Sequence, residues 1–381
     1  MAAVRPRDKV RIAIIASKSI AGGDLDNFTS LMIRNDITMP SEASFEVGDD
    51  GTWNALGDIF EPGVEFQIYI NDTPRMRGRV EMNDVPLDTM AGAVVRFTVR
   101  TKLSDAMFAS ANQGTRVQGA SLQAFILELY APLGYTAQDF IFLQGTSRDL
   151  MTGRSAFTNA VPVNLDRIKL SEARVKPPET IYAAADRHLR RHGFMHWDGP
   201  TGEIVVGAPG DDEDPTYTFN MYRDPSRSMT NNVLGATRTR DWSGVPSSVN
   251  VYGRGGKRGF TRSNVGATAN DLDVTAAGFY RPLHILAEGI RTNELAIRAA
   301  NRELSNRSKR KDGFSIDVDG FSFWDGTELT LYAPDTVAQL NTDIAGGNAG
   351  AYYIHATTLT RDASGGDACA LDLVRRGIWT L

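Results

Sequence analysis

Apolar and polar residues alternate along most of the first hundred positions. In EFQIYINDTPRMRGRVEM (65–82), Phe66, Ile68 and Ile70 alternate with polar neighbours, and the pattern resumes after the NDTP turn. A period of two places alternate side chains on opposite faces of a strand, so this stretch predicts a hairpin with one buried face. Short strands at regular spacing are typical of a small barrel or sandwich. Four further strands are predicted at VRIAIIA (10–16), FTSLMIR (28–34), ASFEVGD (43–49) and VVRFTVRTK (94–102).

The period changes in the middle of the chain. In SLQAFILELYAPLGY (121–135) the apolar residues recur at helical spacing, Ser121 is a suitable N-cap, and Pro132 with Gly134 ends the helix. A second helix is predicted between the prolines of PPETIY and Gly193. The turn residues DGPTG then lie between two short apolar strands. We therefore expect helices near 121–131 and 178–192 and a hairpin over 194–207.

The C-terminal third returns to alternation. A predicted helix near 293–310, with Thr292 as its N-cap, interrupts the alternating pattern. The stretch 253–279 has the composition of a variable surface loop. Strands are predicted at PSSVNVYGRG, at YRPLHILAEG, over Phe314 to Val318, and at YYIHATTLTRD paired with DACALDLVRRGIW.

The order of these elements predicts a mainly β fold with α/β insertions. We expect a first β domain over 1–104, a mixed α/β domain over 105–215, and a second β domain over 216–381 that contains the inserted helix.

Composition narrows the class of protein. The chain has 381 residues, a formal net charge of −5 and one cysteine, Cys369. A single cysteine allows no intrachain disulfide framework and no Cys-rich zinc module, and its position in an alternating run favours a packing role. The run VRIAIIA is too short to cross a bilayer, so no membrane insertion is expected. The negative charge disfavours strong binding of nucleic acid.

The stretch RHLRRHGFMHW (187–197) raises the question of a metal site. It places His188, His192 and His196 four residues apart. Gly193 ends the predicted helix, so His188 and His192 share a helix while His196 lies on the following strand. HLRRH lacks the glutamate that the HExxH motif of zinc hydrolases needs, and it carries two adjacent arginines, Arg190 and Arg191. The alternative is that these cationic residues stabilise the C-terminal turn of the helix.

Other chemical motifs are incomplete. GRGGKRG (253–259) lacks the spacing of a phosphate-binding loop, and GDDEDP (210–215) lacks the alternating ligands of a calcium loop. No GxSxG or CxxC motif occurs. We therefore nominate no catalytic, cofactor-binding or metal-binding residue, and no cofactor.

An ordered series of these motifs resembles the baseplate hub proteins of contractile phage tails, close to the Mu-like hub and related to the late control protein D family. The series covers most of the chain, and the stretch 280–326 is its most specific part. It comprises EFQIYIN…RGRVEM, VRFTVRTK, LYAPLGY, ETIYAAADRHLRRHGFMHWDGPTGEIVV, VNVYGRG and YRPLHILAEG…ELAIRAANREL…GFSIDVDGFSFWDG.

The resemblance implies a fold and an assembly. Such hubs carry two tail-tube-like β-barrels per subunit, and three subunits form a pseudo-hexameric ring that joins a hexameric tail tube to a trimeric spike. The implied partners are two further copies of the chain, the tail tube protein or a distal tube ring, the central spike protein and other baseplate proteins. The implied location is the tail baseplate of a virion, assembled in the host cytoplasm. The chain shows no short repeat typical of a β-helical needle, so we expect the spike to be a separate protein.

Three alternatives stay open. One is a metal hydrolase using His188 and His192, one is a cell-wall hydrolase, which would need a carboxylate pair, and one is the hub of a tail-derived injection device.

The hub hypothesis also predicts the charge of the channel. A basic lining would hold duplex DNA through many phosphate contacts, so DNA should pass through a neutral or acidic lumen without specific binding. The basic residues of HLRRH and RSKRKDG should then lie on outer or subunit-contacting surfaces: Arg190, Arg191, Arg307, Lys309 and Arg310.

Overall fold

The computed structural model describes most of the chain. The described residues are 6–15, 22–25, 28–48, 61–84, 87–88, 92–117, 120–143, 152, 165, 168, 170, 173–228, 230–254, 264–287, 290, 292–309, 311–343, 349–362 and 366–376.

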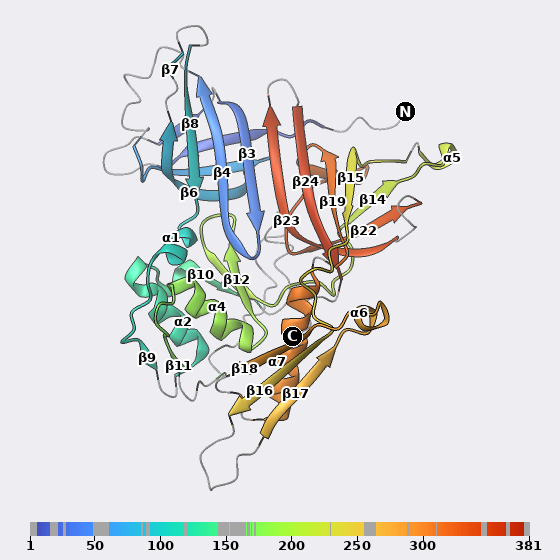
Figure 1. The fold of residues 1–381 in the computed structure, drawn as a ribbon. Coiled ribbons are helices and arrows are strands. Elements are labelled where there is room, and N and C mark those ends of the chain that lie inside the picture. The colour runs from blue at the N-terminus through green and yellow to red at the C-terminus, as the bar shows by residue number, and fades with distance from the viewer. Residues whose placement is uncertain are drawn as a thin grey trace.

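One large, mainly antiparallel sheet dominates the structure (Figure 1). It contains 14 strands, and its N-terminal part has the alternation predicted from the sequence: Ala43, Phe45 and Val47 are buried on β4, and their neighbours are not. Phe45, Phe66 and Phe97 bring three strands together, with ring centroids 5.0–5.9 Å apart. The strands of this first set are β1 (Val10–Ile14), β2 (Gly23–Leu25), β3 (Phe28–Asp36), β4 (Met39–Gly48), β5 (Glu65–Ile70), β6 (Thr73–Asp84), β7 (Leu87–Asp88) and β8 (Gly92–Arg100).

A second set of strands comes from the C-terminal part of the chain. The predicted pairing of β23 with β24 is confirmed, and Phe314, Ile316 and Val318 of β19 are buried and alternate with less buried neighbours, as expected. The strands of this second set are β14 (Tyr217–Met221), β15 (Gly235–Thr239), β19 (Gly313–Asp319), β22 (Thr336–Thr342), β23 (Gly350–Asp362) and β24 (Gly366–Arg375), with the separate hairpin β20 (Ser322–Trp324) and β21 (Leu329–Leu331) beside them.

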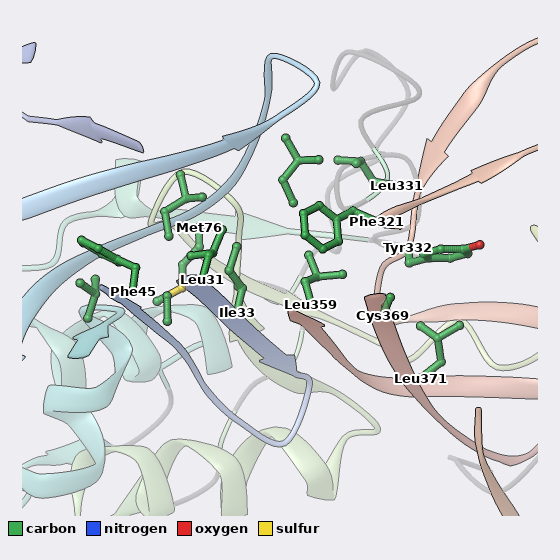
Figure 2. Close-up of a cluster of buried hydrophobic side chains, with 14 of the residues drawn as sticks. Leu31, Ile33, Phe45, Met76, Phe321, Leu331, Tyr332, Leu359, Cys369 and Leu371 are labelled. Atoms are coloured by element: carbon green, nitrogen blue, oxygen red, sulfur yellow. The ribbon is translucent and has the colours of Figure 1, made fainter. Parts of the chain in front are cut away.

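The two sets are joined into one sheet by β3 and β23. Their antiparallel pairing runs from Asp36 opposite Ala356 to Ser30 opposite Asp362. Figure 2 shows Leu31 and Ile33 beside Leu359, so residues about 330 positions apart in sequence share one hydrophobic cluster. The mainly β prediction is confirmed. Within the described residues, 14 strands form one continuous sheet and no closed barrel is present, whereas the resemblance implied two tail-tube-like β-barrels.

A mixed α/β unit packs below the first set of strands (Figure 1). The predicted helices and hairpin are confirmed as α2 (Leu122–Tyr130), α4 (Ile181–Arg191), β12 (Met195–Asp198) and β13 (Ile204–Gly207). Ser121 and Thr180 cap the two helices by accepting hydrogen bonds from the amides of Ala124 and Ala183. The unit also contains α1 (Leu103–Phe108), η3 (Ala131–Leu133), η4 (Ala137–Asp139), β10 (Phe140–Phe142), β9 (Arg116–Val117) and β11 (Ala173–Arg174).

A third unit lies inside the range predicted for the second β domain. Its strands β16 (Ser248–Arg254), β17 (Asn264–Asn270) and β18 (Pro282–Ala287) form their own sheet, and α7 (Asn293–Ser308) covers one face around Val249, Val251, Ala296 and Ala300. The range 253–279, which we expected to be a variable loop, therefore contains β17 and the short helix α6 (Leu272–Ala276). The inserted helix packs on this separate sheet, and not on the large one. A further short helix, α5 (Pro225–Ser228), follows β14.

Candidate functional site

The predicted histidine cluster is dispersed by the fold. His188 lies on α4, His192 is the residue after that helix, and His196 lies on β12, as the position of Gly193 predicted. The ring of His188 is buried against Phe125, with the ring centroids 4.6 Å apart, and His196 is buried against Tyr182 at 4.3 Å. The three imidazoles therefore face different surroundings.

Burial sets the protonation of these histidines. Desolvation lowers the pKa of both His188 and His196 to about 4, and Arg187 and Arg191 add to the effect at His188. Both rings are neutral at pH 7. Across the described ranges, no group of three or more His, Cys, Asp or Glu side chains is arranged to hold a metal ion. The histidines of this stretch act as packing groups in the described structure.

The arginines of the same stretch form ion pairs on α4. Arg190 pairs with Asp186 at 2.7 Å, one helical turn before it, and Arg187 pairs with Glu179 at 2.6 Å. Cations near the C-terminal end of a helix are also stabilised by the helix dipole. Arg307 on α7 makes a similar pair with Glu303, whereas Arg310 lies outside the described residues.

Asp198 is a buried carboxyl at the junction of two units. It accepts hydrogen bonds from the Ser41 amide at 2.6 Å and the Thr101 hydroxyl at 2.8 Å. Burial raises its pKa to about 7, although these hydrogen bonds act in the opposite direction. Because both donors belong to the large sheet or the loop after it, Asp198 attaches the β12–β13 hairpin to that sheet.

A charged cleft lies between the large sheet and the β12–β13 turn. It has a volume of about 310 Å³ and is lined by Glu65, Arg77, Arg79, Asp139 and Glu203, among others. Glu65 pairs with Arg77 at 2.6 Å, and Glu203 accepts hydrogen bonds from the amide and hydroxyl of Thr201. Partial burial would raise the pKa of Asp139, but hydrogen bonds from Thr136 lower it. A glycosidase needs one carboxylic acid that stays protonated near neutral pH, and the lowered pKa of Asp139 is opposite to that requirement.

A second cavity of about 300 Å³ lies where the third unit joins the large sheet. Trp242, Lys311 and Asp312 are among its lining residues. Lys311 pairs with Asp271 and Asp273, each at 2.7 Å, and Asp312 pairs with Arg238 at 2.8 Å. The charged residues of this cavity thus form ion pairs that attach the third unit to the large sheet.

The acidic stretch and the single cysteine have structural contacts in the described part of the chain. The acidic stretch 210–215 is held by its backbone: Arg376 donates to the carbonyl of Asp211, and the amide of Gly210 donates to Asp335. Cys369 is fully buried in the large core, and burial raises the pKa of its thiol, which disfavours a nucleophilic role. Residues 255–259 of the glycine-rich stretch lie outside the described residues. Within the described part of the chain, no helix combines the length and hydrophobicity that a membrane crossing needs.

No protein-family model and no curated protein matches the sequence. Comparison with solved structures is informative about the fold. The tail protein from Neisseria meningitidis MC58 matches with a TM-score of 0.74 and 16% identity, covering 98% of both chains. The tail protein of prophage MuSo2 from Shewanella oneidensis matches with a TM-score of 0.71 and 16% identity, covering 97% of this chain and 99% of that one.

A more distant likeness extends to secretion systems. A type VI secretion component of E. coli, described as similar in structure to the T4 tail proteins gp27 and gp5, matches with a TM-score of 0.51 and 9% identity. This match covers 96% of the present chain and 76% of the other. The chain therefore shares the fold of phage tail proteins over nearly its whole length.

Proposed function

We propose that the protein is a structural component of a phage-type tail, and specifically the baseplate hub of a contractile tail. The observation that carries this proposal is the fold shared with two tail proteins over almost the entire chain. The resemblance of its ordered motifs to the contractile-tail hubs gives the finer assignment. A non-enzymatic role agrees with this, since the buried carboxyl and imidazole groups described above hold units together or pack in cores.

The arrangement of strands supports a ring of three subunits. Each chain contributes two sets of strands to one sheet, joined edge to edge by β3 and β23. Three chains with two sets each would present six similar segments to a hexameric tail tube while keeping the threefold symmetry of a spike. In this proposal the subunit adapts one symmetry to the other, contacts neighbouring baseplate proteins, and lies in the baseplate of the virion.

The ring would enclose the channel through which the genome leaves. Duplex DNA carries one phosphate charge per about 1.7 Å of axis, so a lining without a basic stripe would let it pass. The net charge of −5 agrees with such a lining. Arg190, Arg191 and Arg307 lie on the helices α4 and α7, outside the large sheet.

The test is the stoichiometry of the protein alone and in particles. We expect a trimer by light scattering, or a monomer that becomes trimeric when the tube or spike protein is added, and threefold symmetry at the tail tip in electron micrographs. Obligate interfaces of this kind bury about 2,000 Å² or more, so a stable trimer should persist on dilution. A monomer or dimer that shows no threefold arrangement in any assembly would refute the proposal.

A second candidate is the hub of a tail-derived injection device that carries no genome. The likeness to the E. coli secretion component favours it, at a lower TM-score than the two phage tail proteins. Purified particles distinguish the two functions, because a phage tail is attached to a DNA-filled head and an injection device is not.

A further inference from the structure

The cavity of about 300 Å³ between the third unit and the second set of strands has a wall built from distant segments. We call it the junction cavity. Arg240 and Trp242 line it from the segment between β15 and β16, and Arg375, the last residue of β24, lines it from the large sheet. Asp273 of α6 and Lys311, which precedes β19, belong to the same wall. The fold therefore brings cationic, acidic and aromatic groups together around one space.

The aromatic part of the wall is held in place by hydrogen bonds and ring contacts. The indole Nε1 of Trp242 donates to the carbonyl of Lys311 at 3.2 Å, and the carbonyl of Trp242 accepts from Arg281 at 2.6 Å. The Trp242 ring packs edge-on against Phe279, with the ring centroids 6.2 Å apart. The guanidinium of Arg281 lies 4.5 Å from the centroid of Phe279. Trp242 and Phe279 are thus fixed before a ligand binds, which lowers the entropic cost of binding.

Both described carboxylates of the wall are engaged in ion pairs within the chain. Asp273 pairs with Lys311 at 2.7 Å, and Lys311 also pairs with Asp271. Asp312 accepts two hydrogen bonds from Arg238, at 2.8 and 2.9 Å. Among the described residues, three cations and two carboxylates line the cavity, so positive charge is in excess.

Arg240 and Arg375 supply this excess. The Nε of Arg240 lies 3.7 Å from Asp312, beyond hydrogen-bond distance, and 58% of the Arg240 side chain is exposed. Arg375 is exposed as well, and it acts on Asp273 electrostatically without a hydrogen bond or ion pair to its side chain in the described part of the chain. A guanidinium has five N–H donors, so both arginines can donate to an added acceptor.

Large apolar side chains are exposed beside the junction cavity. Leu272 of α6 is 77% exposed, Tyr280 is 87% exposed, and Phe279, which contacts Trp242, is 40% exposed. Figure 1 shows α6 on the side of the third unit that faces away from the α/β unit, so that unit does not cover this surface. Exposed aromatic side chains next to arginines are typical of the residues that dominate the affinity of protein interfaces.

We propose that the junction cavity is the docking site for an acidic and apolar segment of a partner protein. A carboxylate of this segment binds between Arg240 and Arg375, where charge-assisted hydrogen bonds neutralise the excess positive charge. A neighbouring apolar side chain packs on Phe279 and Tyr280. Duplex DNA would bring several phosphates past the exposed Asp273 and the apolar residues, so a protein segment with one or two carboxylates is the better match. The site does not depend on the ring proposed above.

The test measures binding of a fluorescein-labelled Gly-Ser-Glu-Phe-Glu-Ser-Gly peptide to the full-length protein by fluorescence anisotropy at low salt. The variants are Arg240→Gln, Arg375→Gln and Tyr280→Ala, all at exposed positions. The matched control is Arg96→Gln, which removes an arginine of similar exposure from the large sheet. We expect each of the two arginine variants to weaken binding about tenfold and Tyr280→Ala to weaken it about fivefold, while the control binds as the wild type does.

A second peptide, with glutamine in place of both glutamates, tests the chemistry of the ligand. It should bind the wild type about tenfold more weakly than the glutamate peptide does, because it cannot neutralise the arginines. It should also bind the wild type and the two arginine variants equally. Circular dichroism verifies that each variant is folded, and three separate exposed positions keep the test decisive if one variant misfolds.

Several results would overturn the proposal. The first is that the glutamate peptide shows no binding at roughly 1 mM, or binds the three variants as tightly as the control. The second is tighter binding of a 20-base-pair duplex that the arginine variants abolish, which would identify a nucleic-acid surface. The third is dissociation of an oligomer by the variants in light scattering, which would identify a contact between copies of this chain. The fourth is a tenfold gain in peptide affinity for a chain shortened after Arg376, which would show that the chain's own last residues occupy the cavity.

Discussion

Single buried polar residues connect segments of this protein that are far apart in sequence. Asp198 accepts hydrogen bonds from Ser41 and Thr101, and Asp8 accepts them from the amide of Phe321 and the hydroxyl of Ser322. Each of these carboxylates compensates backbone or hydroxyl donors that would otherwise be buried without an acceptor. Their role in this fold is to attach one unit to another.

His196 predicts a measurable dependence of stability on pH. Its pKa is about 4 in the folded protein, because of burial, and near 6.5 when unfolded. Between these values the unfolded chain binds the proton more readily, so the stabilising contribution is complete above pH 6.5 and is lost as the pH falls toward 4. The His196→Phe variant has no titrating ring at this position. Between pH 7 and pH 4.5, its free energy of unfolding should therefore fall by about 2 kcal/mol less than that of the wild type.

Urea unfolding at the two pH values measures the difference. The control is His284→Phe, which makes the same substitution at a histidine that is exposed on β18 and stacks on Tyr252, outside the core. Equal pH dependence for the His196 variant and the wild type would show that burial of this ring does not control its protonation.

A chelator should leave the protein unchanged. His188 is packed against Phe125 and hydrogen-bonded to the backbone of Arg174, so binding a metal would require its displacement from the core. We expect the same melting temperature with and without EDTA, and no stoichiometric zinc by elemental analysis. Loss of a tightly bound structural metal lowers the melting temperature by several degrees, so a drop of that size would restore the metal hypothesis.

Sequence patterns predicted where these residues lie but not what they contact. The position of Gly193 placed His196 on the strand after α4, which the structure confirms. Asp198 was only a turn residue of a predicted hairpin, because its partner Ser41 is 157 positions away.

At the scale of helices and strands, the period of the apolar residues and the capping residues predicted most elements that have one clearly apolar face. They predicted the hairpin of β5 and β6, the helices α2, α4 and α7, and the caps Ser121 and Thr292. They did not predict α1, which has only six residues, or β17, which is rich in small and polar residues. The parallel pairings of β10 with β13 and β14 with β22 also had no local signal, because such partners are not adjacent in sequence.

Gly78 is required by the close approach of two strands. A Cβ at this position of β6 would lie 2.6 Å from the carbonyl oxygen of Arg100 and 2.8 Å from its carbonyl carbon, and backbone atoms cannot rotate away. Gly78→Ala should therefore lower the free energy of unfolding by about 1–3 kcal/mol. Gly48→Ala at the end of β4 is the matched control, because a Cβ there meets nothing within 4 Å. Denaturant unfolding of both variants is the measurement, and equal stabilities would show that β6 and β8 separate at little cost.

At the scale of the whole molecule, the central feature is that one sheet and one core are shared by the two ends of the chain. The predicted boundary at residue 104 falls inside α1 (Leu103–Phe108), a few residues after β8 ends at Arg100. The pattern of alternation could not reveal that β3 pairs with β23, because the pattern defines which face of a strand is buried and not its neighbour. The shared core also explains why Cys369, Leu359 and Phe321 appear in the same cluster as Leu31 and Ile33 (Figure 2).

This shared core predicts that residues 1–104 do not fold alone. Without the rest of the chain, β3 loses its pairing with β23, and the apolar side chains of Leu31 and Ile33 lose contact with the second set of strands. Asp8 would also lose the amide and hydroxyl donors of Phe321 and Ser322. An unpaired strand edge above an exposed apolar surface favours aggregation over a stable domain.

The experiment compares three samples by circular dichroism during urea unfolding: the fragment 1–104, the fragment 105–381, and the two expressed together. We expect no cooperative transition for the first fragment alone and a transition close to that of the intact chain for the pair, since the covalent link at residue 104 contributes less than the shared sheet. A sharp, independent transition of the 1–104 fragment would instead mean that the first set of strands forms a self-sufficient domain. The two sets of strands would then be separate domains in contact, in the way that the resemblance to baseplate hubs implies.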